Sequence, residues 1–183
     1  MADLLERWDR EHRNFSRLLD VFEAQLALLR EDAEPNYELL LGIMDYLTSY
    51  SDRVHNPKED LIFAEVGKRV PAARQAAEEL MQQHREMAEN GGDLHARLQS
   101  ILNGMIESRE SIDEAGRQYV AAFRDHMDRE YRELFPAARE ALSSEDWNRI
   151  EASSGLDAAD PLAGERLDQQ YDALRREIAA ARD

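Results

Sequence analysis

The sequence predicts an all-α protein, an up-down four-helix bundle with a C-terminal helical extension. Apolar residues recur at spacings of three and four along four long segments, so each segment has one apolar face. No segment shows the strict apolar–polar alternation of a half-buried β-strand. Long helices joined by short turns pack antiparallel around a shared core, which gives the predicted architecture.

Turn residues define the first three helices. The first helix ends in the polar, proline-containing stretch at residues 31–36. The second is expected over residues 37–69, and Pro57 inside it should kink or locally unwind it, because proline lacks a backbone N–H. Pro71 stands in the first turn of the third helix, where proline is favoured.

The remaining turn signals define the end of the bundle and the extension. Asn103 and Gly104 end the third helix, and a fourth is expected to begin at Ser111, with Pro136 near its end. Residues 143–147 are typical of a helix start, and residues 165–180 of a last amphipathic helix. We therefore divide the chain into a bundle over residues 1–141 and a helical extension over residues 142–183 that packs on it.

Composition excludes several classes of function. The 183 residues include 39 acidic and 23 basic side chains, and the net charge of -16 disfavours nucleic acid and anionic membranes as partners. The absence of cysteine excludes disulfides, thiolate metal sites and thiol nucleophiles. No apolar run has the length of a membrane span, and the first six residues lack the character of a signal peptide. We expect a cytoplasmic protein, as a monomer or homodimer.

Four of the five histidines fall at one height in the expected bundle: His12, His55, His84 and His126. His12 lies about 19 residues before the first turn and His55 about 19 after it, so both stand at one level at ~1.5 Å per residue. The same count across the next two turns gives mismatches of only ~3 Å. The fifth, His95, has no partner at its height and is expected to be an ordinary exposed residue.

Two of these histidines carry a glutamate four residues later. Glu59 follows His55, and Glu130 follows His126, so each pair projects from one face of its helix. A carboxylate can bridge two metal ions, and imidazole and carboxylate ligands without sulfur suit iron, manganese or zinc. Because four buried imidazoles and two buried carboxylates are costly without a metal, the six residues predict a dinuclear metal site.

The layout resembles the hemerythrin-like, or HHE cation-binding, proteins over roughly residues 3–140. The matching residues are Glu11-His12, the HNPKED string at residues 55–60, Gln83-His84, and the segment from His126 to Glu130 that runs into Leu134-Phe135-Pro136. This resemblance implies a non-haem, carboxylate-bridged di-iron site. His12 and His55 would bind one iron and His84 and His126 the other, with Glu59 and Glu130 bridging; zinc or manganese are possible substitutes.

One position departs from the oxygen-carrying members of that family. They place a further histidine four residues after the one on the third helix, and here that position is Ala88. Without that ligand, each iron keeps an open coordination position. Two open positions favour redox chemistry on oxygen or peroxide, or additional solvent ligands, over a protected reversible carrier.

Two functions follow from this reading. The first is a di-iron protein that binds or senses oxygen, nitric oxide or iron; the alternative is an enzyme acting on hydrogen peroxide or oxygen, by a catalase-like or oxidase reaction. A helical scaffold without metal is disfavoured, because all six candidate ligands are present. The expected partner is accordingly a small diatomic ligand or peroxide.

Other residues near the candidate ligands are given supporting roles. Asp52, Asp125 and Asp128 lie close enough in sequence to orient the imidazoles. Lys58 and Arg129, each next to a proposed bridging glutamate, are expected to point to solvent or to neighbouring acids. Tyr119 is expected to be a core residue or to lie behind the ligands.

Overall fold

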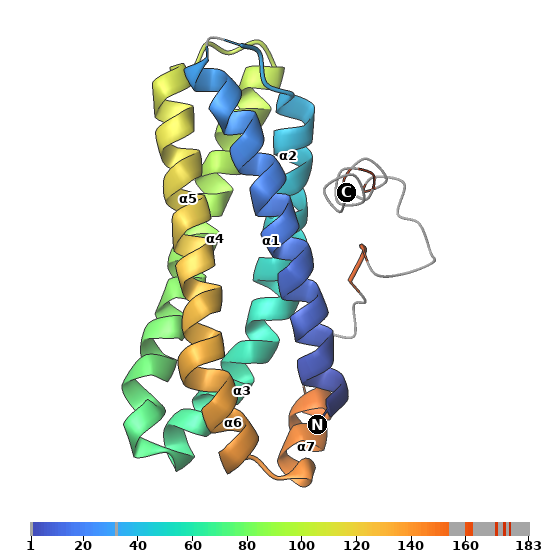
Figure 1. Ribbon diagram of the computed structural model, residues 1–183, viewed down its shortest axis with the longest axis vertical. Helices are drawn as coiled ribbons and strands as arrows, with labels where there is room; N and C mark the ends of the chain where they lie inside the picture. The colour runs from blue at the N-terminus through green and yellow to red at the C-terminus, as the bar shows by residue number, and fades with distance from the viewer. Residues whose placement is uncertain are drawn as a thin grey trace.

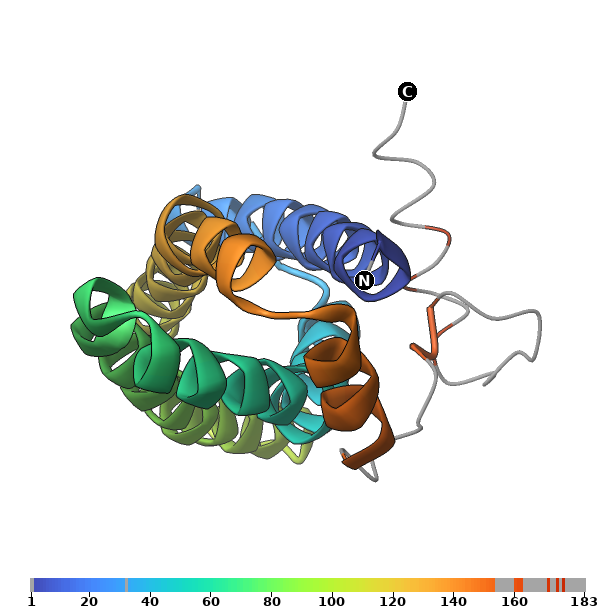
Figure 2. The same cartoon turned by 90° about the horizontal axis from the view of Figure 1, so that it is seen from below.

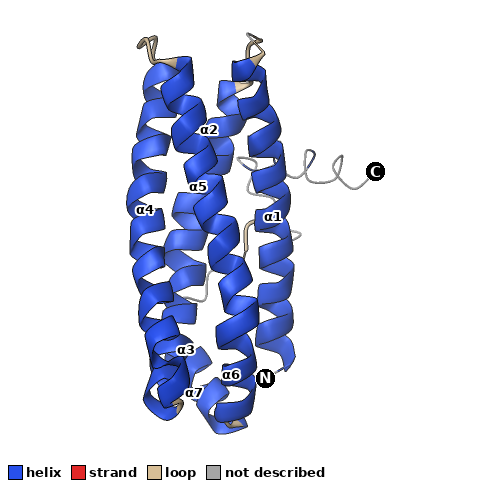
Figure 3. Cartoon of the chain, turned by 60° about the vertical axis from the view of Figure 1, so that its left-hand side comes forward, coloured by secondary structure: helices blue, strands red, loops and turns tan. Residues whose placement is uncertain are grey.

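The computed structural model describes residues 2–31, 33–153, 160–162, 171, 174 and 176. Within these residues every regular element is a helix, which confirms the prediction of an all-helical fold (Figure 3). The elements are α1 (Ala2–Arg30), α2 (Tyr37–Tyr46), η1 (Leu47–His55), α3 (Asn56–Arg69), η2 (Pro71–Ala73), α4 (Arg74–Leu102), α5 (Arg109–Arg129), η3 (Glu130–Leu134), α6 (Phe135–Ala141) and α7 (Ser144–Ser153).

The long helices lie side by side and surround one interior (Figures 1 and 2). α1 packs against α5, and α4 packs against α2, α3 and α5. α6 and α7 follow at the end of the bundle where α3 ends (Figure 1). In the part of the chain that is described, no helix is long and apolar enough to cross a membrane.

The buried apolar side chains form two clusters along the bundle. One contains Phe15, Tyr46 and Phe123, and the other contains Trp8 and Phe63. His12 lies between Trp8 and Phe15 in sequence, and both rings also contact His55. A layer of polar side chains therefore separates two apolar cores, and this layer holds the predicted site.

The second predicted helix is widened rather than broken by its proline. Residues Leu47–His55 form a π-helix directly before Pro57, and the Asn56 N–H donates to the Ser51 carbonyl, five residues back. A proline ring clashes with the carbonyl four residues earlier, and a wider turn relieves that clash. The same arrangement precedes Pro136, where η3 is π-helical.

Two helix starts are set by capping side chains. α5 begins at Arg109, two residues before the predicted start, because the Ser108 hydroxyl accepts from the Ser111 N–H and caps the helix. α7 begins at Ser144, as predicted, and Asp146 accepts from the Ser143 N–H. The last predicted helix, residues 165–180, falls mostly outside the described residues.

Two helical glycines give a test of the packing. A Cβ on Gly92 would meet nothing within 4 Å, whereas one on Gly116 would lie 2.7 Å from a Leu26 methyl carbon. Glycine costs a helix interior about 0.5–1 kcal/mol relative to alanine, so Gly92→Ala should raise the free energy of unfolding by about that amount. Gly116→Ala should lower it. Urea unfolding followed by circular dichroism checks both; stabilisation by Gly116→Ala would contradict the contact of α1 with α5.

Candidate metal centre

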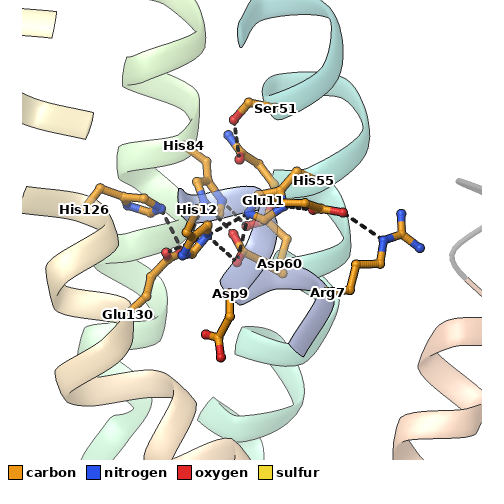
Figure 4. Close-up of polar contacts among 12 residues, drawn as sticks. Arg7, Asp9, Glu11, His12, Ser51, His55, Asp60, His84, His126 and Glu130 are labelled. Atoms are coloured by element: carbon orange, nitrogen blue, oxygen red, sulfur yellow. Dashed lines mark hydrogen bonds and ion pairs between the residues drawn. The ribbon is translucent and has the colours of Figure 1, made fainter. Parts of the chain in front are cut away.

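All six residues singled out from the sequence meet inside the bundle. Figure 4 shows the four histidines and Glu130 turned towards one another. Each of the six is at most 4 % exposed. They come from every long helical segment: His12 from α1, His55 from the end of η1, Glu59 from α3, His84 from α4, His126 from the end of α5, and Glu130 from the start of η3. The two π-helical segments thus carry His55 and Glu130 into the polar layer.

The first half of the cluster has ligand-like spacing. The Nε2 atoms of His12 and His55 are 2.9 Å apart, and Glu59 Oε1 lies 3.4 Å and 3.2 Å from them. Two ligand atoms about 2.1 Å from one metal ion, at right angles, are themselves ~3 Å apart. These three atoms are therefore spaced as neighbouring ligands of a single ion.

The second half is built from His84 and His126. Glu130 Oε1 lies 2.9 Å from His126 Nε2 and 3.7 Å from His84 Nε2. Its other oxygen, Oε2, lies 3.6 Å from His12 Nε2, in the first half. Glu59 is arranged in the opposite way: its Oε1 lies near His12 and His55, and its Oε2 lies 3.6 Å from His84 Nε2 in the second half. Each glutamate thus turns one oxygen towards each histidine pair, as a bridging carboxylate does.

The unsatisfied atoms of the cluster fit a pair of metal ions. Both carboxylate oxygens of Glu59 and of Glu130 are buried without a hydrogen-bond partner, and so are Nε2 of His84 and of His126. Burial of such polar atoms is costly unless a partner compensates. Cations bound among them would satisfy all six atoms, and nitrogen and oxygen donors without sulfur suit iron, manganese or zinc.

The pKa values of two candidate ligands in the metal-free protein also favour a bound cation. Burial alone would lower the pKa of His55, but the carboxylates of Glu59 and Glu11 raise it to about 10. Burial also opposes the charged form of His84, and Asp60, Glu130 and Glu59 still hold its pKa well above the usual value. Protons on His55 and His84 balance the buried carboxylates, and a bound cation would take over that role.

The side chains that orient the imidazoles are ones that sequence analysis missed. Glu11 Oε2 lies 2.5 Å from His55 Nδ1, Asp60 Oδ1 lies 2.7 Å from His84 Nδ1, and Gln83 Oε1 lies 3.1 Å from His126 Nδ1. Such partners fix the ring and strengthen it as a ligand. The expected candidates were wrong: Asp125 and Asp128 are exposed, and Asp52 accepts from the Asn56 amide instead.

Glu11 is held by a network of its own. The Arg7 guanidinium donates to Glu11 Oε1 at 2.8 Å and the Tyr50 hydroxyl at 2.9 Å (Figure 4 shows Arg7 and Glu11). Burial alone would raise the pKa of Glu11, but these donors and His55 lower it to about 2. The residue is therefore a carboxylate at neutral pH, placed behind a candidate ligand.

The two halves of the site repeat one pattern. In each, a polar residue directly before the histidine of one helix bonds the histidine of the next: Glu11 reaches His55, and Gln83 reaches His126. Asp60, the residue after Glu59, holds His84. This repeat is the signal in the sequence that could have revealed these three partners.

The repeat fails at one position. Tyr131, the residue after Glu130, stands where Asp60 stands in the other half. Its ring lies edge-on to the His12 ring at 5.5 Å, and His12 Nδ1 is buried without a hydrogen-bond partner. A cavity of about 310 Å³ adjoins this histidine, lined by Arg13, Ser16, Arg124, Met127, Asp128 and Tyr131. Of the six clustered residues, only His12 lines this cavity.

Two basic residues beside the glutamates behave differently. Lys58 was expected at the solvent or against acids; the structure corrects the first expectation, because Lys58 is only 7 % exposed on α3. Arg129 meets the expectation, because its guanidinium lies 2.8 Å from Glu79.

Tyr119 and His95 lie outside the cluster. Tyr119 is buried in the core against Phe123, with ring centroids 5.9 Å apart, and its hydroxyl has no hydrogen-bond partner. The His95 side chain is 30 % exposed, and its Nε2 lies 3.6 Å from Asp45. His95 is thus partly buried rather than simply exposed, but it contributes nothing to the metal centre.

Comparison with known proteins finds one family. The model of the hemerythrin HHE cation-binding domain matches residues 3–138, a range that contains all six clustered residues. No curated protein and no solved structure matches the chain.

The carboxylate behind His55 gives a test of the site. Glu11→Gln keeps the shape but removes the charge, so it should lower metal affinity by roughly 10- to 100-fold. Gln83→Glu places a carboxylate behind His126 and should raise the affinity. Competition against a chelator measures both, with the exposed Glu140→Gln as control. Equal affinities in all four proteins would show that Glu11 does not support a ligand.

The raised pKa of His55 gives a second test. A metal ion needs the neutral imidazole, whereas His55 with a pKa of about 10 is protonated at neutral pH in the metal-free protein. Binding must therefore expel protons, and affinity should rise with pH until about 10. Zinc titration calorimetry in buffers of different protonation enthalpy, between about pH 6 and about pH 8, counts the protons. Affinity independent of pH over this range would contradict the expected protonation.

Proposed function

This chain belongs to the hemerythrin HHE cation-binding domain family, and we propose that it is a non-haem di-iron protein that binds or senses oxygen, nitric oxide or iron. One iron would be held by His12 and His55 and the other by His84 and His126, with Glu59 and Glu130 bridging. In this proposal the helices alternate in direction as an up-down four-helix bundle, and residues 142–183 pack on it as an extension.

One observation carries the proposal. Glu59 and Glu130 are each at most 1 % exposed, and all four of their oxygens lack a hydrogen-bond partner while facing opposite histidine pairs. A carboxylate that merely balanced one protonated histidine would need to face one pair only. Two carboxylates that each face both pairs support two cations held side by side.

The surrounding residues prepare the site for such a pair. Iron supplies a redox couple and open coordination positions when bound. Phe15 and Trp8, both fully buried, pack against His55 and keep water from its side of the site. Glu11 and Asp60 hold the Nδ1 atoms, so that Nε2 of His55 and of His84 faces the cluster.

A second candidate function is turnover of hydrogen peroxide or oxygen. Ala88 offers no ligand atom where oxygen carriers of the family have a further histidine. The cavity beside His12 adds a passage for a molecule of that size. Both features support reaction with peroxide rather than protected storage of oxygen.

Metal content tests the proposed site. Protein reconstituted anaerobically with ferrous iron should carry two irons per chain by mass spectrometry, with near-ultraviolet absorption after exposure to air. Glu130→Ala and His126→Ala should each lower the iron content and change the spectrum, because each removes a donor. His95→Ala, outside the cluster, should behave as the unmodified chain. A chain that takes up no iron under these conditions would overturn the proposal.

The two candidate functions separate in one further measurement. Peroxide consumption far above that of free ferrous iron would support the enzyme. A spectral change that reverses when oxygen or nitric oxide is removed, without consumption, would support binding or sensing. Both assays use the loaded chain and the His126→Ala variant as its matched control.

A further inference from the structure

Three tyrosines form a line of adjacent rings that starts at the candidate metal centre. Tyr50 of η1 stacks on Tyr46 of α2, with centroids 5.6 Å apart and an interplanar angle of 20°. Tyr46 in turn meets Tyr171 of the C-terminal segment edge-on, again at 5.6 Å. Rings this close exchange electrons readily, so the line is continuous from end to end.

Each of these tyrosines donates its hydroxyl proton towards a carboxylate. Tyr50 donates to Glu11 at 2.9 Å, and Tyr46 donates to Asp160 at 2.8 Å. The Tyr171 hydroxyl lies 3.3 Å from Asp45 Oδ2. Any polar atom would satisfy a buried phenol, but an ionised carboxylate is purely an acceptor and can take the proton itself.

A proton acceptor changes what a tyrosine can do. A phenol loses an electron much more readily when its proton leaves at the same moment, because the product is then a neutral radical rather than a cation. Burial raises the pKa of Asp160 above its usual value, which makes this carboxylate a better base. Each of the three tyrosines thus has a carboxylate acceptor; Asp160 is a stronger base than Glu11, whose pKa is lowered to about 2 by His55 and Arg7.

The line is connected at both ends. Glu11 accepts from Tyr50 with one oxygen, and its other oxygen lies 2.5 Å from Nδ1 of His55, so one carboxylate separates the first phenol from a candidate ligand. At the far end, the side chain of Asp45 is 35 % exposed. A proton received there can exchange with solvent.

We propose that Tyr50, Tyr46 and Tyr171 form a relay that delivers single electrons to the di-iron centre when it reacts with hydrogen peroxide. The inference rests on the proposed di-iron function. It adds a peroxidase-type activity, in which the electrons for peroxide come through the protein from a small one-electron reductant.

The electrons and protons of this reaction balance. Reduction of one hydrogen peroxide to two waters consumes two electrons and two protons; the electrons would come through the tyrosines and the protons from solvent. Oxidation of Tyr50 would send one electron towards the residues that would hold the irons, while its proton would shift along the existing hydrogen bond to Glu11 and stay shared there. An electron from Tyr46 restores Tyr50 with its proton, and one from Tyr171 restores Tyr46. A reductant such as ascorbate then restores Tyr171, and two such passages reduce one peroxide.

Two neighbouring aromatic residues, Trp8 and Tyr119, lack the necessary partner. The Trp8 ring lies 6.0 Å from that of His55, but its indole N–H is buried without an acceptor. The Tyr119 hydroxyl is likewise buried without an acceptor. Tyr119 is therefore a matched control, a buried tyrosine whose conversion to phenylalanine removes no hydrogen bond. Tyr131 does have such a partner: its ring lies 5.5 Å from that of His12 and its hydroxyl donates to Asp9 at 3.0 Å, so Tyr131→Phe is needed as a further control.

The experiment locates the radical in the loaded chain. Protein shown to carry two irons per chain is oxidised in air, mixed with hydrogen peroxide and frozen for electron paramagnetic resonance; a parallel sample receives a nitrone spin trap and is mapped by peptide mass spectrometry. We expect a tyrosyl signal and trap adducts at Tyr171. Tyr46→Phe should cut the adducts at Tyr171 by at least about fivefold, because phenylalanine has no phenolic proton to release.

Two controls decide the outcome. Tyr171→Phe, which removes only the outermost hydroxyl, should abolish the adducts at position 171 and alter the tyrosyl signal, whereas Tyr119→Phe should leave both as in the unmodified chain. A loaded chain without a tyrosyl signal, equal signals in the metal-free chain, or unchanged Tyr171 adducts in Tyr46→Phe would each overturn the relay. Failure to load iron would instead overturn the proposed function, so the two failures are distinguishable.

Discussion

Two buried carboxylates in the middle of an apolar bundle are the constraint on which the rest of the structure depends. Glu59 and Glu130 lie between two apolar clusters, where an unpaired charge is very costly. The structure meets that cost with four imidazoles around them, of which His55 and His84 have raised pKa values, and all four would hold metal when it is bound. Burial of large side chains above and below the layer stabilises the bundle in spite of this polar interior.

The backbone is adapted to the same layer. π-helical turns occur at the two places where a proline follows a candidate ligand closely, before Pro57 and before Pro136. Each removes a clash that would otherwise end the helix, and each shifts the phase of the residues beside it. His55 ends one such turn and Glu130 begins the other, so the irregular backbone and the chemistry coincide.

Sequence reasoning succeeded where a single helix carries the information. Periodicity predicted the helices, and counting residues from the turns placed four histidines at one height, where the structure also has them. The partners of the imidazoles were missed, because Glu11 and Gln83 act across to the next helix and their direction depends on how the helices are rotated. Lys58 is buried and not at the solvent, which was one of its two expected positions. The identity of the metal, the cytoplasmic location of the protein and its oligomeric state stay predictions.

The one departure from the repeated pattern, Tyr131 in the place that Asp60 has in the other half, lies where a cavity adjoins the site. Asp60 fixes His84 through its Nδ1, while Tyr131 offers His12 only a ring edge. The cavity opens at the same place. An imidazole without an acceptor behind it is less firmly oriented than its three counterparts, since it lacks the bond that holds the ring. The half of the centre beside the cavity is therefore also the half whose coordination the protein constrains least.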